Sequence, residues 1–342
     1  VGPGHRGFEI QMDPGLTLQE ASARRDFTIN SMMLDPRTGE VIDPHGGMKD
    51  LVERRLRHTS DAFFEDPLRV LRGMQFVGRF RLTPDPATVA LCRKMVPMQS
   101  ELPVERVREE WWKWATLSEA PSMGLAFAMD AGWLDVHPEL TGMRGVEQDP
   151  EWHPEGDVWA HTSHAVDALA SMDAWRRSDE RTRGALMLAV LLHDAGKATH
   201  TRREWKDGRE RVVSPGHEVA GVPMAEAFMA RLGMPNEMRQ RVPPLVGNHM
   251  AHLVQPTARA IRRLSLRLAP ATIDELCEVM TADASGRPPR PRREPEAVRA
   301  MRTMARGMAL EASVPRPLVL GRHLVARGWE PGPRFKAVLE LA

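Results

Sequence analysis

The chain has 342 residues, of which 42% are hydrophobic and 27% are charged, with a formal net charge of +1. This length allows two or three domains, and no apolar run is long enough to span a bilayer. Because the charge is nearly neutral, a nucleic-acid-binding surface would have to come from local clustering of basic residues.

The ends of the sequence and its cysteines give two further expectations. The first residue is Val1, in a glycine-rich stretch, and the last is Ala342, in an apolar helical run, so we expect both ends to lie inside a longer protein. Cys92 and Cys277 are far apart and have no paired spacing. Neither a disulfide framework nor a thiolate zinc site follows from this spacing, which fits the reducing cytoplasm.

Residues 1–58 have the pattern of a mixed α/β region. The strand-like segments 31–34 and 40–42 flank the turn-forming segment 35–39, which predicts a hairpin. From about residue 59 onward, apolar positions recur at helical spacing. We therefore predict a mostly α fold with a small α/β region at its start.

Asp66 and Arg69 are three residues apart at the start of a predicted helix, so both side chains can face one ligand. A carboxylate accepts hydrogen bonds and a guanidinium donates them, a combination that matches cytosine and adenine. Guanine and uracil would leave buried groups unpaired at roughly 1–3 kcal/mol each. The pair therefore predicts selection of C and A without a template, although an Asp before Pro67 is also an ordinary helix cap.

Four segments in this order resemble class II CCA-adding tRNA nucleotidyltransferases and bacterial poly(A) polymerases. They are residues 23–30 (ARRDFTIN), 43–47 (DPHGG), 56–58 (LRH) and 62–72 (AFFEDPLRVLR), and residues 104–110 (VERVREE) resemble the next helical motif of that family. The resemblance implies a head that binds the sugar and phosphates of a nucleotide and a helical neck that reads its base.

The resemblance also implies roles for individual residues. The ribose and phosphates would be contacted by Arg24, Arg25 and Asp26. The base would be read by Asp66 and Arg69, with Glu65 orienting Arg69 and Arg72 completing the nucleotide-binding set. A mobile loop that switches the site from C to A would contain Asp43, Gly46 and Gly47.

One part of the family pattern is missing. The resemblance implies an Asp-x-Asp pair upstream of Arg24, where Mg²⁺ aligns the triphosphate and activates the tRNA 3′-hydroxyl. This sequence contains no Asp-x-Asp, and 23 residues precede Arg24. We attribute the missing pair to truncation, and we expect this chain to bind nucleotide weakly and not to catalyse transfer. The implied partners of the complete protein are ATP, CTP, and the 3′ end and acceptor arm of tRNA.

A second set of residues has the chemistry of a metal site. Imidazoles and carboxylates suit Mn²⁺, Fe²⁺, Co²⁺, Ni²⁺ or Mg²⁺, and six such ligands could hold two bridged ions for phosphate-ester hydrolysis. The ordered set resembles the HD phosphohydrolase superfamily and consists of His161, His193, Asp194, His217, His249 and Asp283. His164, His200 and His252 are alternative ligands.

A basic stripe is predicted further along the chain. It is formed by Arg259, Arg262, Arg263 and Arg267, at i, i+3, i+4 and i+8 of one helical face. Apolar residues occupy another face of the same helix, so the stripe suits an RNA phosphate backbone. A solvated charged face is the plain alternative.

These observations predict a mostly α protein with five parts. They are a partial α/β nucleotidyltransferase head (1–58), a helical neck (59–120), a body or linker (121–154), an all-α HD domain (155–287), and a linker with a helical tail (288–342).

The favoured function is CCA addition to tRNA together with metal-dependent phosphohydrolysis. The alternatives are a poly(A) polymerase of the same family, an HD phosphodiesterase or phosphatase with an RNA-binding N-terminal half, and a non-catalytic RNA-binding protein. Two intact sets argue against the last two, because RNA binding alone needs no reader of base edges. They are Glu65, Asp66 and Arg69, and Arg24, Arg25 and Asp26.

Overall fold

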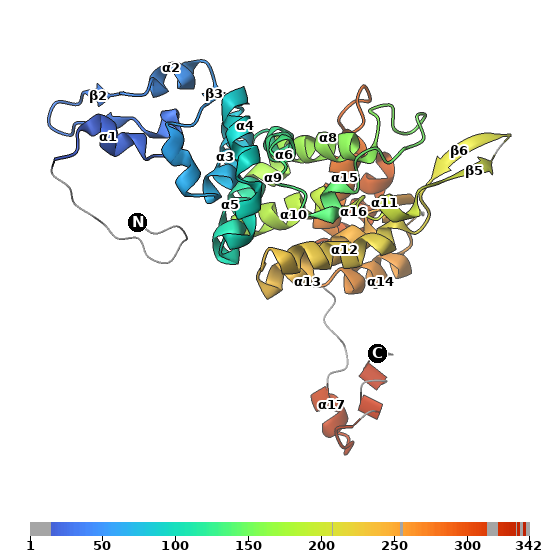
Figure 1. The fold of residues 1–342 in the computed structure, drawn as a ribbon. Coiled ribbons are helices and arrows are strands. Elements are labelled where there is room, and N and C mark those ends of the chain that lie inside the picture. The colour runs from blue at the N-terminus through green and yellow to red at the C-terminus, as the bar shows by residue number, and fades with distance from the viewer. Residues whose placement is uncertain are drawn as a thin grey trace.

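The computed structural model describes residues 15–206, 208–253, 256–312, 321–332, 334–335 and 338–339. Helices dominate this part of the chain, and its strands form three separate two-stranded sheets (Figure 1). The mostly α prediction is therefore confirmed. Among these residues, no helix combines the length and apolar character needed to cross a membrane.

Residues 15–58, the head segment, are built from short elements. In chain order these are α1 (Leu18–Ala23), η1 (Thr28–Asn30), β1 (Met33–Leu34), β2 (Val41–Ile42), α2 (Gly47–Val52) and β3 (Arg55–Leu56). β1 and β2 pair in antiparallel fashion, which confirms the predicted hairpin. Phe27 packs edge-on against Phe63, with ring centroids 5.4 Å apart, and so fixes the head segment to the helices that follow.

Residues 59–120, the neck segment, and the residues that follow them up to 157 are mainly helical. Their elements are η2 (Asp61–Glu65), α3 (Leu68–Phe80), β4 (Thr83–Pro84), α4 (Pro86–Lys94), η3 (Val96–Glu101), α5 (Val104–Leu117), α6 (Pro121–Asp130) and α7 (Pro138–Thr141). Helix α3 packs against both α5 and α6. The predicted helix after Pro67 is therefore present, and its apolar face joins the core.

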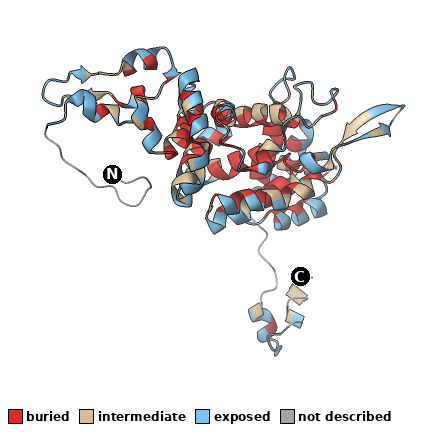
Figure 2. Ribbon diagram, in the orientation of Figure 1, coloured by how far each residue is buried: buried red, intermediate tan, exposed pale blue. Residues whose placement is uncertain are grey.

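The second helical block begins at Val158. Its elements are α8 (Val158–Ser171), α9 (Asp173–Arg177), α10 (Glu180–Leu192), α11 (Lys197–His200), β5 (Arg202–Lys206), β6 (Arg209–Val213), α12 (His217–Arg231), α13 (Asn236–Asn248), η4 (Ala251–Leu253), α14 (Ala258–Leu268) and α15 (Ile273–Ser285), and α16 (Glu296–Gly307) and α17 (Gly321–Val325) follow. Helix α10 is buried along residues 184–192 and contacts α8, α13 and α15 (Figure 2). It is the central element of this block.

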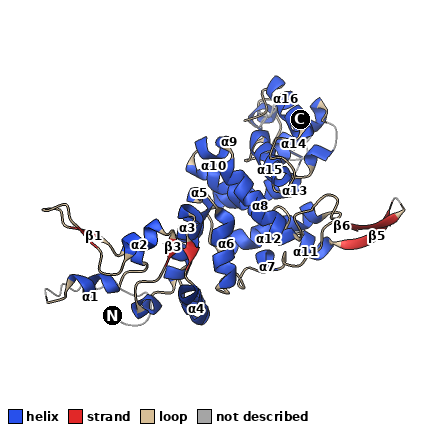
Figure 3. Cartoon of the chain, turned by 90° about the horizontal axis from the view of Figure 1, so that it is seen from above, coloured by secondary structure: helices blue, strands red, loops and turns tan. Residues whose placement is uncertain are grey.

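A β-hairpin interrupts the otherwise helical block. Strands β5 and β6 pair in antiparallel register from Arg202–Val213 to Lys206–Arg209, and the hairpin projects from the helices (Figure 3). The all-helical expectation for residues 155–287 did not include it, because its charged residues do not show a clear apolar alternation. The sequence Asp207-Gly208 between the strands is a hairpin signal that could have predicted it.

Candidate functional site

A cavity of about 360 Å³ lies where the head segment meets α3 and α5. Its volume is in the range of small-ligand sites. We call it the head–neck cavity, and it is lined by Arg25, Asp26, Asn30, Asp66, Leu68, Arg69, Arg72, Arg106, Glu109, Glu110 and Lys113. The structure thus brings together five of the seven predicted nucleotide-binding residues. The other two, Arg24 and Glu65, are outside the lining.

Asp26 holds its neighbours by hydrogen bonds. It is 6% exposed, and one carboxylate oxygen accepts from Nε of Arg72 at 2.6 Å. The other oxygen accepts from the side-chain amide of Asn30 at 3.1 Å and from the backbone N–H of Phe27 at 2.9 Å. Asp26 therefore orients the Arg72 guanidinium at the cavity wall.

Arg69 is held by backbone carbonyl groups. Its guanidinium donates to the carbonyl oxygens of Ala62 at 2.6 Å and of Arg24 at 2.5 Å. Burial lowers the pKa of Arg69, because it disfavours the charged form. The expectation that Glu65 orients Arg69 needs correction, since Glu65 pairs with Arg24 at 2.7 Å. Carbonyl acceptors replace the predicted carboxylate.

Asp66 has a cationic partner that the sequence analysis did not single out. One of its oxygens accepts from the backbone N–H of Leu68 at 3.0 Å, and the other lies 3.2 Å from a guanidinium nitrogen of Arg106. Arg106 is on α5, inside the 104–110 segment whose resemblance to a family motif was the available signal. Arg106 thereby fixes one oxygen of the predicted base reader.

The predicted mobile loop forms the start of α2 and does not line the head–neck cavity. Asp43 accepts from the backbone N–H groups of Gly47 at 2.7 Å and Met48 at 2.8 Å. Burial raises the pKa of Asp43, but the hydrogen bonds from these backbone donors lower it by more. The net shift of the Asp43 pKa is therefore downward. Gly46 has a φ of +74°, and a Cβ on Gly47 would lie 2.1 Å from the carbonyl oxygen of Thr28, so both positions favour glycine.

The six predicted metal ligands meet in the core of the second helical block. They come from α8, the end of α10, the start of α12, the end of α13, and α15, and each residue is at most 4% exposed. Their ligand atoms form two triplets within which all distances are at most 4.8 Å. We call this set the six-donor cluster, with triplets His161–His193–Asp283 and Asp194–His217–His249.

The backbone fixes the tautomer of three of the imidazoles. Nδ1 of His193, His217 and His249 each lies 2.7 Å from the carbonyl oxygen three residues earlier. A carbonyl only accepts, so each Nδ1 carries the hydrogen and each neutral ring has its lone pair on Nε2. Burial lowers the pKa of His249 to about 3, which keeps that ring neutral.

These lone pairs face one another across short distances. Nε2 of His217 is 3.1 Å from Nε2 of His249, and Nε2 of His193 is 3.3 Å from Nε2 of His161. Asp194 also lies 3.2 Å from Nε2 of both His193 and His217. Acceptors that face acceptors in a buried space are unfavourable unless a cation lies between them. The donor set therefore fits divalent metal ions.

Two cations neighbour the carboxylates of the cluster. The Nζ atom of Lys197 is 2.7 Å from Asp194, and a guanidinium nitrogen of Arg287 is 2.5 Å from Asp283. Burial would raise the pKa of Asp194 and of Asp283, but neighbouring positive charges hold both well below the usual range. Both carboxylates are therefore ionised, as metal ligands must be.

A tight backbone contact holds the ligands of α10 and α12 together. A Cβ on Gly196 would lie 2.1 Å from the carbonyl oxygen of His217, so only glycine allows this approach. Of the alternative ligands, His164, His200 and His252 belong to neither triplet. Sequence reasoning missed Lys197, whose only signal was its position four residues after His193.

A second cavity, of about 580 Å³, opens beside the six-donor cluster. We call it the cluster cavity. Its lining includes Asp194, His217 and Asp283 of the cluster, Lys197 and Arg287 next to them, and Trp152, His153, Arg202, Lys206 and His252 around them. A phosphate ester in this space would meet both cationic side chains and the metal-ligand set.

The predicted basic stripe lies on α14. Its four arginines, Arg259, Arg262, Arg263 and Arg267, are all exposed. Ile261, Leu264 and Leu268 are buried on the other face of the helix. In the part of the chain that the structure describes, none of the four arginines pairs with a carboxylate. Their charge is available to an anionic partner.

Two known protein families match parts of the chain. Residues 6–57 match the poly A polymerase head domain, and residues 159–285 match the HD domain. All six residues of the cluster lie inside the second match.

Two similar proteins are multifunctional CCA proteins. That of Stenotrophomonas maltophilia (strain K279a) is 39% identical over 256 residues, which is 73% of this chain and 59% of the relative. That of Xanthomonas campestris pv. campestris (strain B100) is 37% identical over 302 residues, which is 84% of this chain and 69% of the relative. The chain thus spans less than two thirds of the first relative's length.

Solved structures share the fold at low sequence identity. The CCA-adding enzyme of Bacillus stearothermophilus in complex with CTP aligns with a TM-score of 0.57 and 17% identity, over 95% of this chain and 68% of that one. The Thermotoga maritima CCA-adding enzyme complexed with tRNA aligns with a TM-score of 0.51 and 16% identity, over 94% and 68%. At this identity the likeness concerns the fold alone.

Proposed function

The chain belongs to the multifunctional CCA protein family, and from this premise we propose that its head–neck cavity selects CTP and ATP for completion of the CCA end of tRNA. The single observation that carries the proposal is that Asp66 and Arg69 line one small cavity with head-segment residues Arg25 and Asp26. An acceptor and a donor fork in one cavity match the edges of cytosine and adenine.

Different residues of the head–neck cavity contact the base, hold the base-contacting side chains and bind the phosphates. Arg69 offers donors and Asp66 offers acceptors to the base, while the carbonyls of Ala62 and Arg24 and the guanidinium of Arg106 hold them in place. The remaining cations of the cavity, such as Arg25 and Lys113, suit the phosphates of the nucleotide. Mg²⁺ would supply alignment of the triphosphate in phosphoryl transfer. Since this sequence has no Asp-x-Asp pair, we expect selection of nucleotide without transfer.

The test is nucleotide binding by equilibrium dialysis with each of the four triphosphates. We expect CTP and ATP to bind more tightly than UTP and GTP by about fivefold or more, the size of one unpaired polar group. Equal binding of all four would refute the assignment of base selection to this cavity. Incorporation of CTP into tRNA lacking its CCA end would instead overturn the expectation of no transfer.

A second activity is favoured by the six-donor cluster, which we propose hydrolyses phosphate esters at RNA 3′ ends. The residues that would hold divalent transition metals are His161, His193, Asp194, His217, His249 and Asp283. Such ions activate water and polarise the phosphoryl group. Lys197 and Arg287 lie beside the same carboxylates and would bind and orient the phosphate.

The measurement is hydrolysis of a phosphomonoester and a 2′,3′-cyclic phosphate by protein supplied with Mn²⁺, Co²⁺ or Ni²⁺. Activity that depends on the added metal supports the assignment. Bound metal without hydrolysis of either substrate would rule it out.

We also propose a partner and a location for this protein. The acceptor arm of tRNA is the proposed partner of the exposed α14 arginines. The cytoplasm is the proposed location, since both cysteines are free and buried.

A further inference from the structure

We propose that Glu155 is a positioning residue that serves two imidazoles at once, directing His161 toward the six-donor cluster and His153 toward the substrate in the cluster cavity. The proposal rests on the metal-binding role of the cluster given above. It assigns a role to a loop residue outside the ligand set, and it narrows the substrate to one with a free ribose hydroxyl beside its phosphate.

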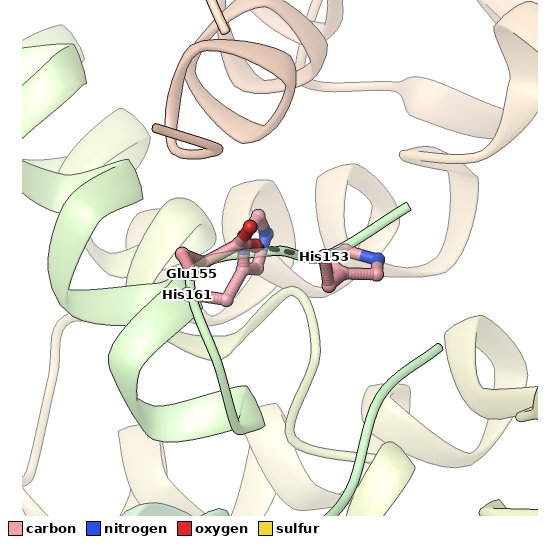
Figure 4. A group of neighbouring side chains, drawn as sticks. All are labelled: His153, Glu155 and His161. Carbon is pink, nitrogen blue, oxygen red and sulfur yellow. Dashed lines mark hydrogen bonds and ion pairs between the residues drawn. The ribbon is translucent and has the colours of Figure 1, made fainter. Parts of the chain in front are cut away.

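The geometry around Glu155 is specific. The same carboxylate oxygen lies 2.7 Å from Nδ1 of His161 and 2.8 Å from Nδ1 of His153 (Figure 4). The Glu155 side chain is 0% exposed. One carboxylate oxygen that lies within hydrogen-bonding distance of two ring nitrogens accepts from both, so both rings carry their hydrogens on Nδ1.

His161 differs in this respect from the other three imidazoles of the cluster. Those rings donate to backbone carbonyls, whereas His161 donates to a carboxylate. A carboxylate behind a ligand imidazole fixes its orientation and increases its basicity as a ligand. With Nδ1 occupied, Nε2 is the atom of His161 left to bind a metal, and it lies 3.1 Å from Asp283 and 3.3 Å from Nε2 of His193.

A separate metal site formed by these three groups fits less well. The atoms of His153, Glu155 and His161 are close enough for one. However, a metal there would have to displace the hydrogens of both Nδ1 atoms and would leave His161 bridging two sites. Two hydrogen bonds of ordinary length, both to Oε1 of Glu155, account for the approach of the two imidazoles. Among the described residues, Oε2 of Glu155 is buried without a hydrogen-bond partner.

His153 is hydrogen-bonded to Glu155 and lines the cluster cavity, so Glu155 orients a side chain that faces the substrate. Its side chain is 12% exposed and lines the cavity, and its ring centroid is 4.8 Å from that of His161. Because Nδ1 is bound to Glu155, the polar atom left for a substrate is Nε2, which accepts. Phosphate oxygens are themselves acceptors, so the matching donor is a hydroxyl. A ribonucleotide 3′-phosphate provides one on the adjacent carbon, and its 2′-deoxy analogue does not.

The first arm of the test measures metal affinity, which does not depend on turnover. We expect Glu155→Ala to weaken Ni²⁺ binding by calorimetry about 10–100-fold, the usual effect of losing such a partner. Glu155→Gln, which keeps the size of the side chain, should weaken it less, and Glu155→Asp should restore part of the affinity. Glu147→Gln, an exposed residue of the same loop, should bind like the wild type. Wild-type affinity in folded Glu155→Gln and Glu155→Ala would overturn the proposal.

The second arm compares hydrolysis of adenosine 3′-phosphate and 2′-deoxyadenosine 3′-phosphate. The wild type should favour the ribonucleotide about fivefold to tenfold in kcat/KM, the size of one hydrogen bond. His153→Phe should lose this preference and keep the wild-type Ni²⁺ affinity. A preference that survives His153→Phe, or metal affinity that falls as far as in Glu155→Ala, would contradict the role of His153. If no variant hydrolyses either substrate, the proposed hydrolysis fails, while the metal-affinity arm still decides the role of Glu155.

Discussion

In the head–neck cavity Asp66 and Arg69 have protein partners, whereas in the six-donor cluster imidazole nitrogens face one another. Arg69 donates to two carbonyl oxygens, and Asp66 accepts from Arg106. In the cluster, by contrast, Nε2 of His217 lies 3.1 Å from Nε2 of His249. A ligand of the first site exchanges one set of hydrogen bonds for another. A ligand of the second site relieves an unfavourable contact.

This difference predicts different sensitivities to mutation. Loss of one member of the head–neck cavity removes a modest preference among nucleotides, because the remaining groups still have partners. Each triplet of the cluster has one carboxylate, and its loss leaves two neutral imidazoles to bind the ion there. Neutral ligands cannot offset the charge of a dication in a buried space. We therefore expect the largest effects in the cluster.

Asp194→Ala should have the largest effect. Asp194 approaches His193 and His217 at 3.2 Å each and belongs to one triplet while contacting both. Metal affinity should fall more than about 100-fold, beyond the range for outer-shell partners, and hydrolysis should be lost. Metal analysis after dialysis measures this, with the exposed Asp173→Asn as the control. Retained metal in folded Asp194→Ala would remove this residue from the ligand set.

Arg69→Ala should have the next largest effect, confined to nucleotide choice. The variant lacks the donor that meets the acceptor edge of cytosine and adenine, at about 1–3 kcal/mol. The preference of CTP over UTP in equilibrium dialysis should therefore disappear, while metal affinity of the cluster stays unchanged. Arg93→Ala, which removes a surface arginine of α4, is the matched control. Unaltered discrimination in Arg69→Ala would exclude it as a base reader.

His137 tests the packing of α5 of the neck segment against α12 of the second helical block. Its ring packs between Trp111 of α5 and Phe228 of α12, and burial lowers its pKa to about 3. The unfolded chain takes up the proton near pH 6.5, so the free energy of unfolding falls as the pH drops from about 6.5 toward 3. At pH 5 this loss amounts to about 2 kcal/mol.

The variant His137→Leu should not show that loss. Urea unfolding at pH 7 and pH 5 should give a smaller pH-dependent drop for the variant than for the wild type. Identical drops in the two proteins would mean that His137 is protonated as readily in the folded state as in the unfolded one.

The double variant Arg262→Ala/Arg263→Ala should have the smallest effect of these changes, and the effect should be on tRNA binding. Both residues are exposed on α14, and removing one arginine that binds a phosphate lowers the slope of log affinity against log salt by about 1. Binding of tRNA should weaken, and its salt dependence should decrease by about 2 in slope, since two such arginines are removed. A slope equal to that of the wild type would mean that these two arginines do not contact RNA phosphates and that the stripe is a solvated charged face.

Much of this arrangement could be predicted from the sequence, because it depends on order and spacing. The hairpin of β1 and β2 in the head segment follows from its turn residues, and the helix after Pro67 follows from the apolar periodicity. The six cluster residues could be proposed from their order along the chain. Their pairing could not, because His161 and Asp283 are 122 positions apart and meet only through helix packing.

The remaining differences have physical causes of the same kind. Glu65 is four residues before Arg69, yet it pairs with Arg24, because the head segment brings that guanidinium closer. The Glu155 carboxylate has no local pattern that marks it, since its two imidazole partners are defined by a loop that folds back on α8. The hairpin of β5 and β6 had a signal in Asp207-Gly208, which the charged strands obscured.

The most direct test of the account is the number of metal ions that the six-donor cluster binds. Protein freed of metal is titrated with Mn²⁺ by calorimetry, and the spectrum of the loaded protein is recorded by electron paramagnetic resonance. We predict two ions per chain with magnetic coupling between them, since Asp194 approaches ligands of both triplets. One ion per chain, or none in folded protein, would contradict it.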